Sequence, residues 1–164
     1  MAIQTVTKEW EKIKLADVCV DTETVNPARH PSTQIKYVDV SAVSNKTLTI
    51  ESHETLLGKD APSRARKLIR ENDTIFATVR PTLRRVALVT KEFDGDICST
   101  GYCVVRSDEK KADANFIYFE LCSDDVNDYV KGIQRGVSYP AISDNDLFRF
   151  TFALPELSEQ ETTL

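Results

Sequence analysis

Residues 74–90 read Thr74-Ile75-Phe76-Ala77-Thr78-Val79-Arg80-Pro81-Thr82-Leu83-Arg84-Arg85-Val86-Ala87-Leu88-Val89-Thr90, and this stretch decides the fold. Both flanks are rich in β-branched and apolar residues, which predicts strands at 74–79 and 86–90. Arg80-Pro81 ends the first strand because proline has no N–H to donate to a sheet. The segment between the strands carries three arginines. We therefore expect a basic loop fixed by two buried strands, where rigid scaffolds usually display binding groups.

The neighbouring sequence alternates β-rich runs with loops. Residues 34–43 predict a strand, and residues 47–50 follow a turn and predict weak pairing. A further strand is expected at 97–105, interrupted at Ser99-Thr100-Gly101, where the glycine indicates a bulge or a close approach to the backbone. The last strand is expected at 148–154. Near the start of the chain, residues 10–18 predict a short strand or turn that buries Trp10 and Leu15.

Helical patterns in this chain are short. From Asp113, which fits an N-cap, the apolar spacing becomes helical, and a break at 123–125 divides it into two helices. Residues 63–69 follow Pro62 and predict a helical turn with Ser63 near its N-cap and the guanidinium groups outward. Residues 134–140 predict an irregular loop and residues 144–147 a turn.

Length and composition limit the class of protein. The 164 residues, of which 41% are hydrophobic, suit one domain with a sizeable core. The opening residues lack the apolar core of a signal peptide, and no apolar run approaches a membrane span, so we expect a cytoplasmic protein with no membrane partner. Neither histidine has ligand-like spacing to a cysteine, and no CxxC pair occurs, so reduced thiols and no metal site are expected. The cysteines are Cys19, Cys98, Cys103 and Cys122.

Charge is unevenly distributed along the chain. The net charge is -5, which by itself argues against a nucleic-acid partner because phosphate neutralisation supplies most non-specific affinity. Between Arg64 and Lys91, however, eight basic residues face only two acidic ones, and six of the eight are arginine. A basic stripe on an acidic body allows a protein to meet DNA with one face. Arginine also offers a planar fork that matches phosphate or the guanine edge.

Eight short pieces occur in one order along the chain. They are Trp10 to Leu15, Ile35-Lys36-Tyr37-Val38-Asp39-Val40, Ala61-Pro62-Ser63-Arg64-Ala65-Arg66, Asp73-Thr74-Ile75-Phe76, Val79-Arg80-Pro81, Ser99-Thr100-Gly101, Tyr139-Pro140-Ala141-Ile142 and Leu154-Pro155-Glu156-Leu157-Ser158-Glu159-Gln160. Together they resemble the target-recognition domain of type I restriction-modification specificity subunits, over residues 10–160. The closing piece, 154–160, is the most specific of them.

The resemblance implies a mixed α+β fold with a curved, largely antiparallel β-sheet and short helices. It also implies sequence-specific recognition of double-stranded DNA as one half of a bipartite-site reader, with no catalysis and no cofactor in this chain. Partner modification (methyltransferase) subunits would bind S-adenosylmethionine, and motor/nuclease subunits would use ATP and Mg. A second copy or a second recognition domain would be a further partner.

The chain departs from the family pattern at three places. Asn72-Asp73 stands where Gly-Asp is frequent, a tolerable exchange because asparagine also accepts a positive φ. Pro155-Glu156 stands where Pro-Pro is common. The sequence ends at Leu164, where a long conserved helix should begin. We therefore predict a recognition domain at 1–155 and the start of a truncated conserved or spacer helix at 156–164, and leave dimerisation and partner docking open.

The predicted DNA-binding residues fall into three groups. The basic group is Arg80, Arg84, Arg85, Arg64, Arg66 and Lys67, expected on phosphates and on at least one guanine edge, with surface salt bridges to the acidic body as the alternative. Ser99, Thr100 and Tyr102 offer hydroxyls beside Gly101, unless this is a plain bulge. Gln134 offers bidentate pairing with adenine and Tyr139 a stacking surface. Lys36, with His30 and Ser41, flanks the first strong strand as a weaker candidate.

Two rival readings remain. An enzyme would need a cysteine nucleophile activated by His30 or His53, and the sequence contains no nucleophile elbow, P-loop or PD-(D/E)xK spacing, so catalysis is not expected. The other rival is a protein-interaction or orphan module that docks a restriction or methylation partner without reading DNA. Its complexes would be insensitive to salt, unlike those of a phosphate binder.

Overall fold

The computed structural model describes residues 9–161 and places the arginine loop at the edge of a buried sheet. Strands β6 (Thr74–Ala77) and β7 (Val86–Leu88) flank the loop and pair antiparallel. Strand β9 (Tyr102–Ser107) pairs with the other edge of β6, and β2 (Cys19–Val20) pairs with β9. The strand order is therefore β2-β9-β6-β7. The strands predicted at 74–79 and 86–90 are confirmed with shorter bounds.

A second four-stranded sheet has the order β4-β3-β8-β5. Its strands are β4 (Glu54–Leu57), β3 (Gln34–Val38), β8 (Ile97–Ser99) and β5 (Ala65–Leu68). Only the β3–β8 pair of this sheet is parallel. A separate antiparallel pair joins β1 (Glu11–Lys14) to β10 (Thr151–Leu154). The mixed, largely antiparallel fold with short helices is confirmed.

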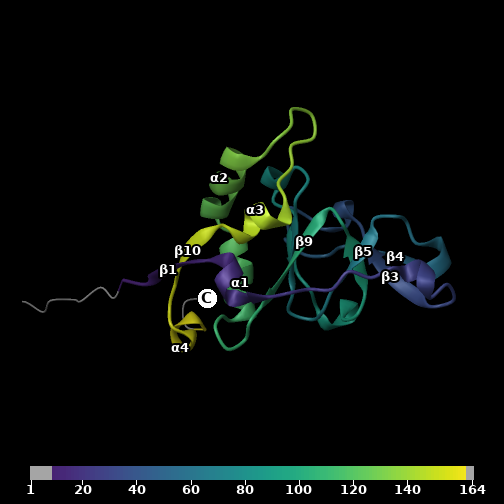
Figure 1. Cartoon of the computed structure of the whole chain (residues 1–164), viewed down its shortest axis with the longest axis horizontal. Helices are drawn as coiled ribbons and strands as arrows, with labels where there is room; N and C mark the ends of the chain where they lie inside the picture. The colour runs from purple at the N-terminus through teal and green to yellow at the C-terminus, as the bar shows by residue number, and fades with distance from the viewer. Residues whose placement is uncertain (1–8, 162–164) are drawn as a thin grey trace, which may run out of the picture.

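The helices gather at one end of the molecule, away from β3 and β4 (Figure 1). They are α1 (Ala114–Leu121), α2 (Asp124–Ile133), α3 (Asp144–Phe148) and α4 (Leu157–Gln160). Asp113 caps α1 and Ser123 caps α2 through side-chain oxygens that accept backbone N–H groups, so the two predicted helices are confirmed. The 3-10 turns are η1 (Leu15–Val18), η2 (Pro27–Arg29), η3 (Val40–Ala42), η4 (Gly58–Asp60), η5 (Pro81–Leu83) and η6 (Lys91–Phe93).

Apolar layers cover both faces of the β2-β9-β6-β7 sheet. Alternate side chains of a strand point to opposite faces, and here Phe76 and Val105 pack with the helices while Ile75 and Val104 pack against the second sheet. This arrangement explains why β6 is buried at every position. The two strands that flank the arginine loop are therefore anchored in a three-layer core.

Long-range pairing overrides local pattern at residues 63–69 and 34–43. The helical turn predicted at 63–69 is wrong: its centre is strand β5, in which Ala65 pairs with Ser99 of β8. The strand predicted at 34–43 ends at Val38, and η3 follows. There the buried Tyr102 hydroxyl contacts the carbonyl oxygens of Asp39 and Val40.

The segment predicted as one broken strand at 97–105 forms two strands in different sheets. The chain crosses between the sheets at Thr100-Gly101, where a Cβ on Gly101 would lie 2.4 Å from Val40 Cγ2. The close approach that this glycine indicated is therefore confirmed.

Three smaller corrections concern Trp10 and the segment 144–154. Trp10 is 38% exposed rather than buried, whereas Leu15 is in the core. The turn predicted at 144–147 is helix α3, whose N-terminus carries a capping box between Ser143 and Asp146. The strand expected at 148–154 begins at Thr151, because α3 occupies residues up to Phe148.

Helix α4 packs against the rest of the domain. The Gln160 side chain is fully buried, and its Oε1 accepts the Asp113 N–H at 2.7 Å. The division into a recognition domain at 1–155 and a helix start at 156–164 stays a prediction. Residues 1–8 of the first part and residues 162–164 of the second lie outside the described residues. No helix within residues 9–161 is long and apolar enough to cross a membrane.

Candidate nucleic-acid interface

The loop between β6 and β7 has an unusual backbone. Arg80 and Arg84 bracket η5, and both adopt left-handed conformations, with φ of 49° and 58°. Such a conformation costs a non-glycine residue about 1 kcal/mol or more and persists only where the surroundings hold it. Here the Arg80 N–H donates to the Pro140 carbonyl at 2.6 Å, and the Arg85 guanidinium donates to the Val43 carbonyl at 2.7 Å. The arginines are therefore held in place before any ligand arrives.

Three of the arginines meet at one open hollow of about 550 Å³, which we call the arginine groove. Arg64 enters it from the turn before β5, Arg80 and Arg85 from the two ends of the β6–β7 loop, and Tyr139 from the loop that follows α2. The remaining lining residues are Asp39, Val40, Ser41, Val79, Leu83 and Ala141. Segments far apart in sequence thus converge on one site.

Tyr139 and Arg80 form the most exposed wall of the arginine groove. The Arg80 Cζ lies 4.7 Å from the centre of the Tyr139 ring, a cation–π arrangement. Tyr139 is 71% exposed, so the stacked pair faces solvent. Stacking fixes the plane of the guanidinium group and leaves its edge donors available for a ligand.

The opposite wall rests on residues that sequence reasoning placed at the surface. Tyr102 is fully buried, and its hydroxyl reaches the carbonyl oxygens of Asp39 and Val40 at 2.7 and 2.9 Å. Burial raises the pKa of the Tyr102 hydroxyl. Ser99 is also fully buried, and its Oγ accepts the Gly101 N–H at 3.0 Å. Both side chains face the interior, where they position the backbone of the groove wall.

Three other predicted basic residues already have partners within the protein. Arg84 is ion-paired with Asp124 at the start of α2. The Lys67 ammonium donates to the Tyr102 carbonyl and to the Asp144 carboxylate, each at 2.6 Å. Arg66 donates to the carbonyl of Ala65 at 3.1 Å. Within residues 9–161 no ion pair engages Arg64, Arg66, Arg80 or Arg85. The side-chain hydrogen bonds of Arg66 and Arg85 are made to backbone carbonyl groups.

The remaining candidates are divided between the groove and other surfaces. Ser41 lines the groove, and Thr100 is exposed beside it, with its N–H bonded to the Arg64 carbonyl at 2.9 Å. Lys36 lies elsewhere, 3.7 Å from the Glu92 carboxylate and 5.4 Å from the centre of the Phe93 ring. His30 follows η2, also outside the groove. The Gln134 side-chain oxygen is buried and has no hydrogen-bond partner among the described residues.

Sequence reasoning missed Asp39, the one acidic residue that lines the arginine groove. The Tyr37 hydroxyl donates to its Oδ1 at 3.2 Å and orients the carboxylate. A carboxylate at a DNA interface repels phosphate but accepts the amino group of cytosine. The sequence placed Asp39 inside a strand, so nothing local separated it from other polar strand residues.

The structure offers little support for cysteine chemistry. All four cysteines are free thiols. Burial raises the pKa of Cys19 and of Cys98 to about 12, so these thiols hold their protons at neutral pH and are poor nucleophiles. Within the described residues, no group of three or more His, Cys, Asp or Glu side chains is arranged to hold a metal ion.

Comparisons with known proteins find relatives of this chain in sequence and in structure. The type I restriction enzyme HindI specificity subunit of Haemophilus influenzae is 25% identical over 108 residues, which cover 65% of this chain and 24% of that protein. The solved HsdS subunit from Thermoanaerobacter tengcongensis is 41% identical with a TM-score of 0.88, over 98% of this chain and 42% of that one. The solved S subunit from M. genitalium, at 13% identity and a TM-score of 0.59 over 99% of this chain and 38% of that one, shares the fold alone.

A further structural match comes from work on complex assembly and conformational transition of the type I R-M system, with 41% identity and a TM-score of 0.89 over 94% of this chain and 40% of that one. The chain thus spans less than half the length of each of these relatives. Residues 7–164 match the family model of the type I restriction modification DNA specificity domain. With this match over nearly its whole length, the chain belongs to the type I restriction modification DNA specificity domain family.

Proposed function

We propose that this domain recognises one half of a bipartite double-stranded DNA site by presenting the arginine groove to the duplex. One observation carries the proposal: Arg80 and Arg85, at the two ends of a pre-positioned loop, share one open groove with Arg64, and none of the three has an ion pair to a described carboxylate. The rest of the protein is acidic, since the net charge is -5. Such a molecule is attracted to DNA through this face and repelled elsewhere.

The chemistry of the groove suits both positioning and reading. A guanidinium fork binds phosphate oxygens or the O6 and N7 atoms of guanine. Arg80 is the best candidate for a base contact because Tyr139 fixes its plane, and Arg64 and Arg85 fit phosphates. Ser41 and Thr100 add hydroxyls at the rim. Arg84 and Lys67 would have to leave carboxylate partners, and Arg66 does not line the groove, so we assign these three smaller contributions.

In this proposal the chain recognises the DNA sequence and catalyses no reaction. Modification subunits with S-adenosylmethionine would methylate the site, and motor/nuclease subunits with ATP and Mg would act from it. A second recognition domain, or a second copy of this one, would read the other half of the site. The domain would work in the cytoplasm.

The test begins with selection of a preferred duplex from a randomised library, with a modification subunit present. Binding of the chain to that duplex is then followed by fluorescence anisotropy at low salt. We expect Arg80→Ala to weaken binding by about 1 to 3 kcal/mol and to relax the preference at one base pair. Arg29→Ala is the matched control, because Arg29 is exposed on η2 outside the groove. Equal binding by wild type, Arg80→Ala and Arg29→Ala would refute the proposal.

A further inference from the structure

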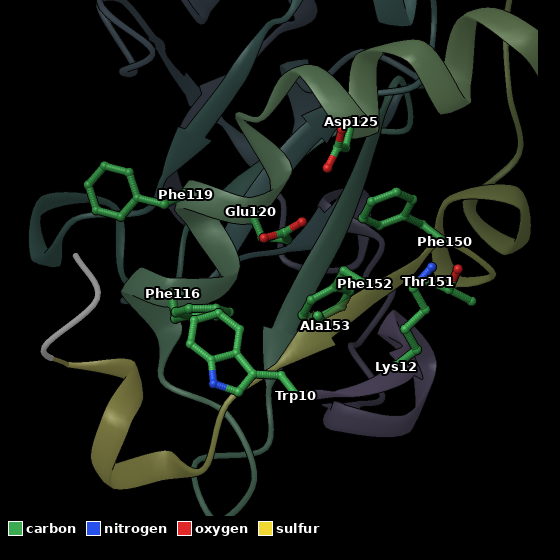
Figure 2. Close-up of a pocket in the computed structure, with 10 residues that line it drawn as sticks. All are labelled: Trp10, Lys12, Phe116, Phe119, Glu120, Asp125, Phe150, Thr151, Phe152 and Ala153. Atoms are coloured by element: carbon green, nitrogen blue, oxygen red, sulfur yellow. The ribbon is translucent and has the colours of Figure 1, made fainter. Parts of the chain in front are cut away.

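A second hollow, which we call the aromatic cleft, lies between α1, the start of α2 and the β1–β10 pair (Figure 2). Its volume is about 450 Å³, and it shares no lining residue with the arginine groove. The aromatic cleft is therefore a separate surface from the one proposed to meet DNA.

Five of the ten residues that line the cleft are aromatic. Phe150 and Phe152 stack with their ring centres 5.9 Å apart and their planes at 11°, and Phe116 lies behind Trp10 in Figure 2. Trp10 is 38% and Phe119 is 56% exposed. Large apolar side chains left open around a hollow are typical of an interaction surface.

Two carboxylates lie among these rings. Glu120, near the end of α1, is half-buried, and Asp125, in the first turn of α2, is exposed. In Figure 2, Glu120 lies between the rings of Phe119 and Phe150, and Asp125 lies above it at the start of α2. Within residues 9–161 neither side chain has an ion-pair or hydrogen-bond partner. Burial, and then the charge of Asp125, raises the pKa of Glu120. Lys12 lines the cleft but forms no ion pair with either of them.

Aromatic rings together with two carboxylates favour one class of ligand over others. DNA is repelled by the two carboxylates. A neutral apolar group would bury the Glu120 charge without a partner, which costs free energy. A cation on an apolar stem satisfies both features, because its charge meets the carboxylates and the aromatic faces while its methylenes cover the rings.

We propose that the aromatic cleft docks a lysine or arginine side chain, flanked by apolar residues, from a protein partner. The cationic head lies between Glu120 and Asp125, and the apolar neighbours pack on Trp10 and Phe119. This surface joins the domain to a protein, whereas the arginine groove joins it to DNA.

Trp10 allows a direct test because it is the single tryptophan of the chain. The probe is a capped Gly-Leu-Arg-Leu-Gly peptide, and the comparison peptide carries neutral citrulline in place of arginine. Trp10 emission is followed during titration of the whole chain with each peptide. We expect a saturable change with the arginine peptide and about tenfold weaker binding of the citrulline peptide, as a charge-dependent contact of about 1.4 kcal/mol requires.

Variants locate the contact. The double variant Glu120→Gln, Asp125→Asn should bind both peptides equally, whereas Asp128→Asn, on an exposed position of α2 outside the cleft, should keep the wild-type difference. Thermal melting verifies that each variant is folded, and DNA affinity of the double variant should not fall. Equal binding of the two peptides by the wild type, or no saturable change with either, overturns the proposal.

Discussion

At the scale of single residues, Asp39 is distinctive because it is an acidic side chain in a groove lined by arginines. Its carboxylate lies in a groove with three guanidinium groups, yet none of the three is within ion-pair distance of it. The Tyr37 hydroxyl orients it instead. Because a carboxylate repels phosphate, we expect Asp39 to act by selecting a base that offers an amino donor rather than by adding non-specific affinity.

We expect Asp39→Asn to change the base preference at one position and to leave non-specific affinity equal or slightly higher, because repulsion of phosphate is lost. The change in preference should be about 1 to 3 kcal/mol. Selection from a randomised duplex library measures it, and Asp60→Asn, on the exposed part of η4, is the control. An unchanged preference in Asp39→Asn would show that this carboxylate does not contact bases.

At the scale of elements, an isolated β-bridge between Arg135 and Ala141, which we call the clip, closes the base of the loop from Gln134 to Pro140. Arg135 and Ala141 exchange backbone hydrogen bonds of 3.0 and 2.9 Å. Gly136 has a φ of +104°, and a Cβ there would lie 3.1 Å from the Tyr139 carbonyl oxygen. Only glycine adopts this conformation without strain, so Gly136 sets the position of the Tyr139 ring against Arg80.

Gly136→Ala should therefore misplace Tyr139. We expect a loss of DNA affinity close to that of Tyr139→Ala, with a loss of folding stability of only about 1 to 2 kcal/mol because the loop lies outside the core. Anisotropy measures the first quantity and urea unfolding the second. Gly132→Ala is the control, since a Cβ there meets no atom within 4 Å. Full affinity in Gly136→Ala would mean that the loop geometry is unimportant for binding.

A carboxylate in helix α3, Asp146, makes the free energy of unfolding depend on pH. The Ser143 backbone N–H and hydroxyl, and then the charges of Arg135 and Arg149, hold the pKa of Asp146 below its ordinary value. A carboxyl whose pKa is lower in the folded state stabilises the fold above its unfolded pKa of about 4. That stabilisation is lost as the pH falls through the lower, folded pKa.

Urea unfolding between pH 6 and pH 2 tests this linkage. The free energy of unfolding of the wild type should decrease as the medium is acidified below about pH 4. Asp146→Asn should be less stable than the wild type at pH 6, and the difference should shrink toward pH 2. A difference that stays constant over the whole range would exclude ionised Asp146 as its source.

At the scale of the whole molecule, basic and acidic side chains gather on different surfaces, and this distribution determines which face attracts which ligand. The acidic aromatic cleft and the arginine groove are separate surfaces, so DNA and a basic protein segment would be drawn to different faces. We expect affinity for DNA to depend on the few cations of the groove and to fall as the cations of added salt compete with them for the phosphates.

The slope of log affinity against log salt should be shallow for this domain, about -0.9 for each phosphate contacted. Arg64→Ala, if Arg64 contacts phosphate, reduces the magnitude of that slope by about 1 without changing base preference. Titrations at several salt concentrations measure it. Arg29→Ala should leave the slope unchanged, and a slope unaffected by Arg64→Ala would assign Arg64 to a role other than phosphate binding.

The sequence alone determined the features that depend on neighbours along the chain. Strands on both sides of the arginine loop, the cap at Asp113, the break between α1 and α2, and the positive φ of Asn72 follow from local periodicity and turn chemistry. Local pattern also found the concentration of arginine. It failed at residues 63–69, where pairing with β8 made a strand of a segment that spacing alone predicted to be helical.

Tertiary structure alone decided which polar groups share a surface. Ser99 and Tyr102 have the hydroxyls of surface ligands, but the crossing of the chain between two sheets buries them. Arg64, Arg80 and Tyr139 come from three separate segments, and only strand pairing and the clip at Ala141 bring them together. The physical reason is that pairing between distant strands depends on the packing of the entire core, which no local window of sequence contains.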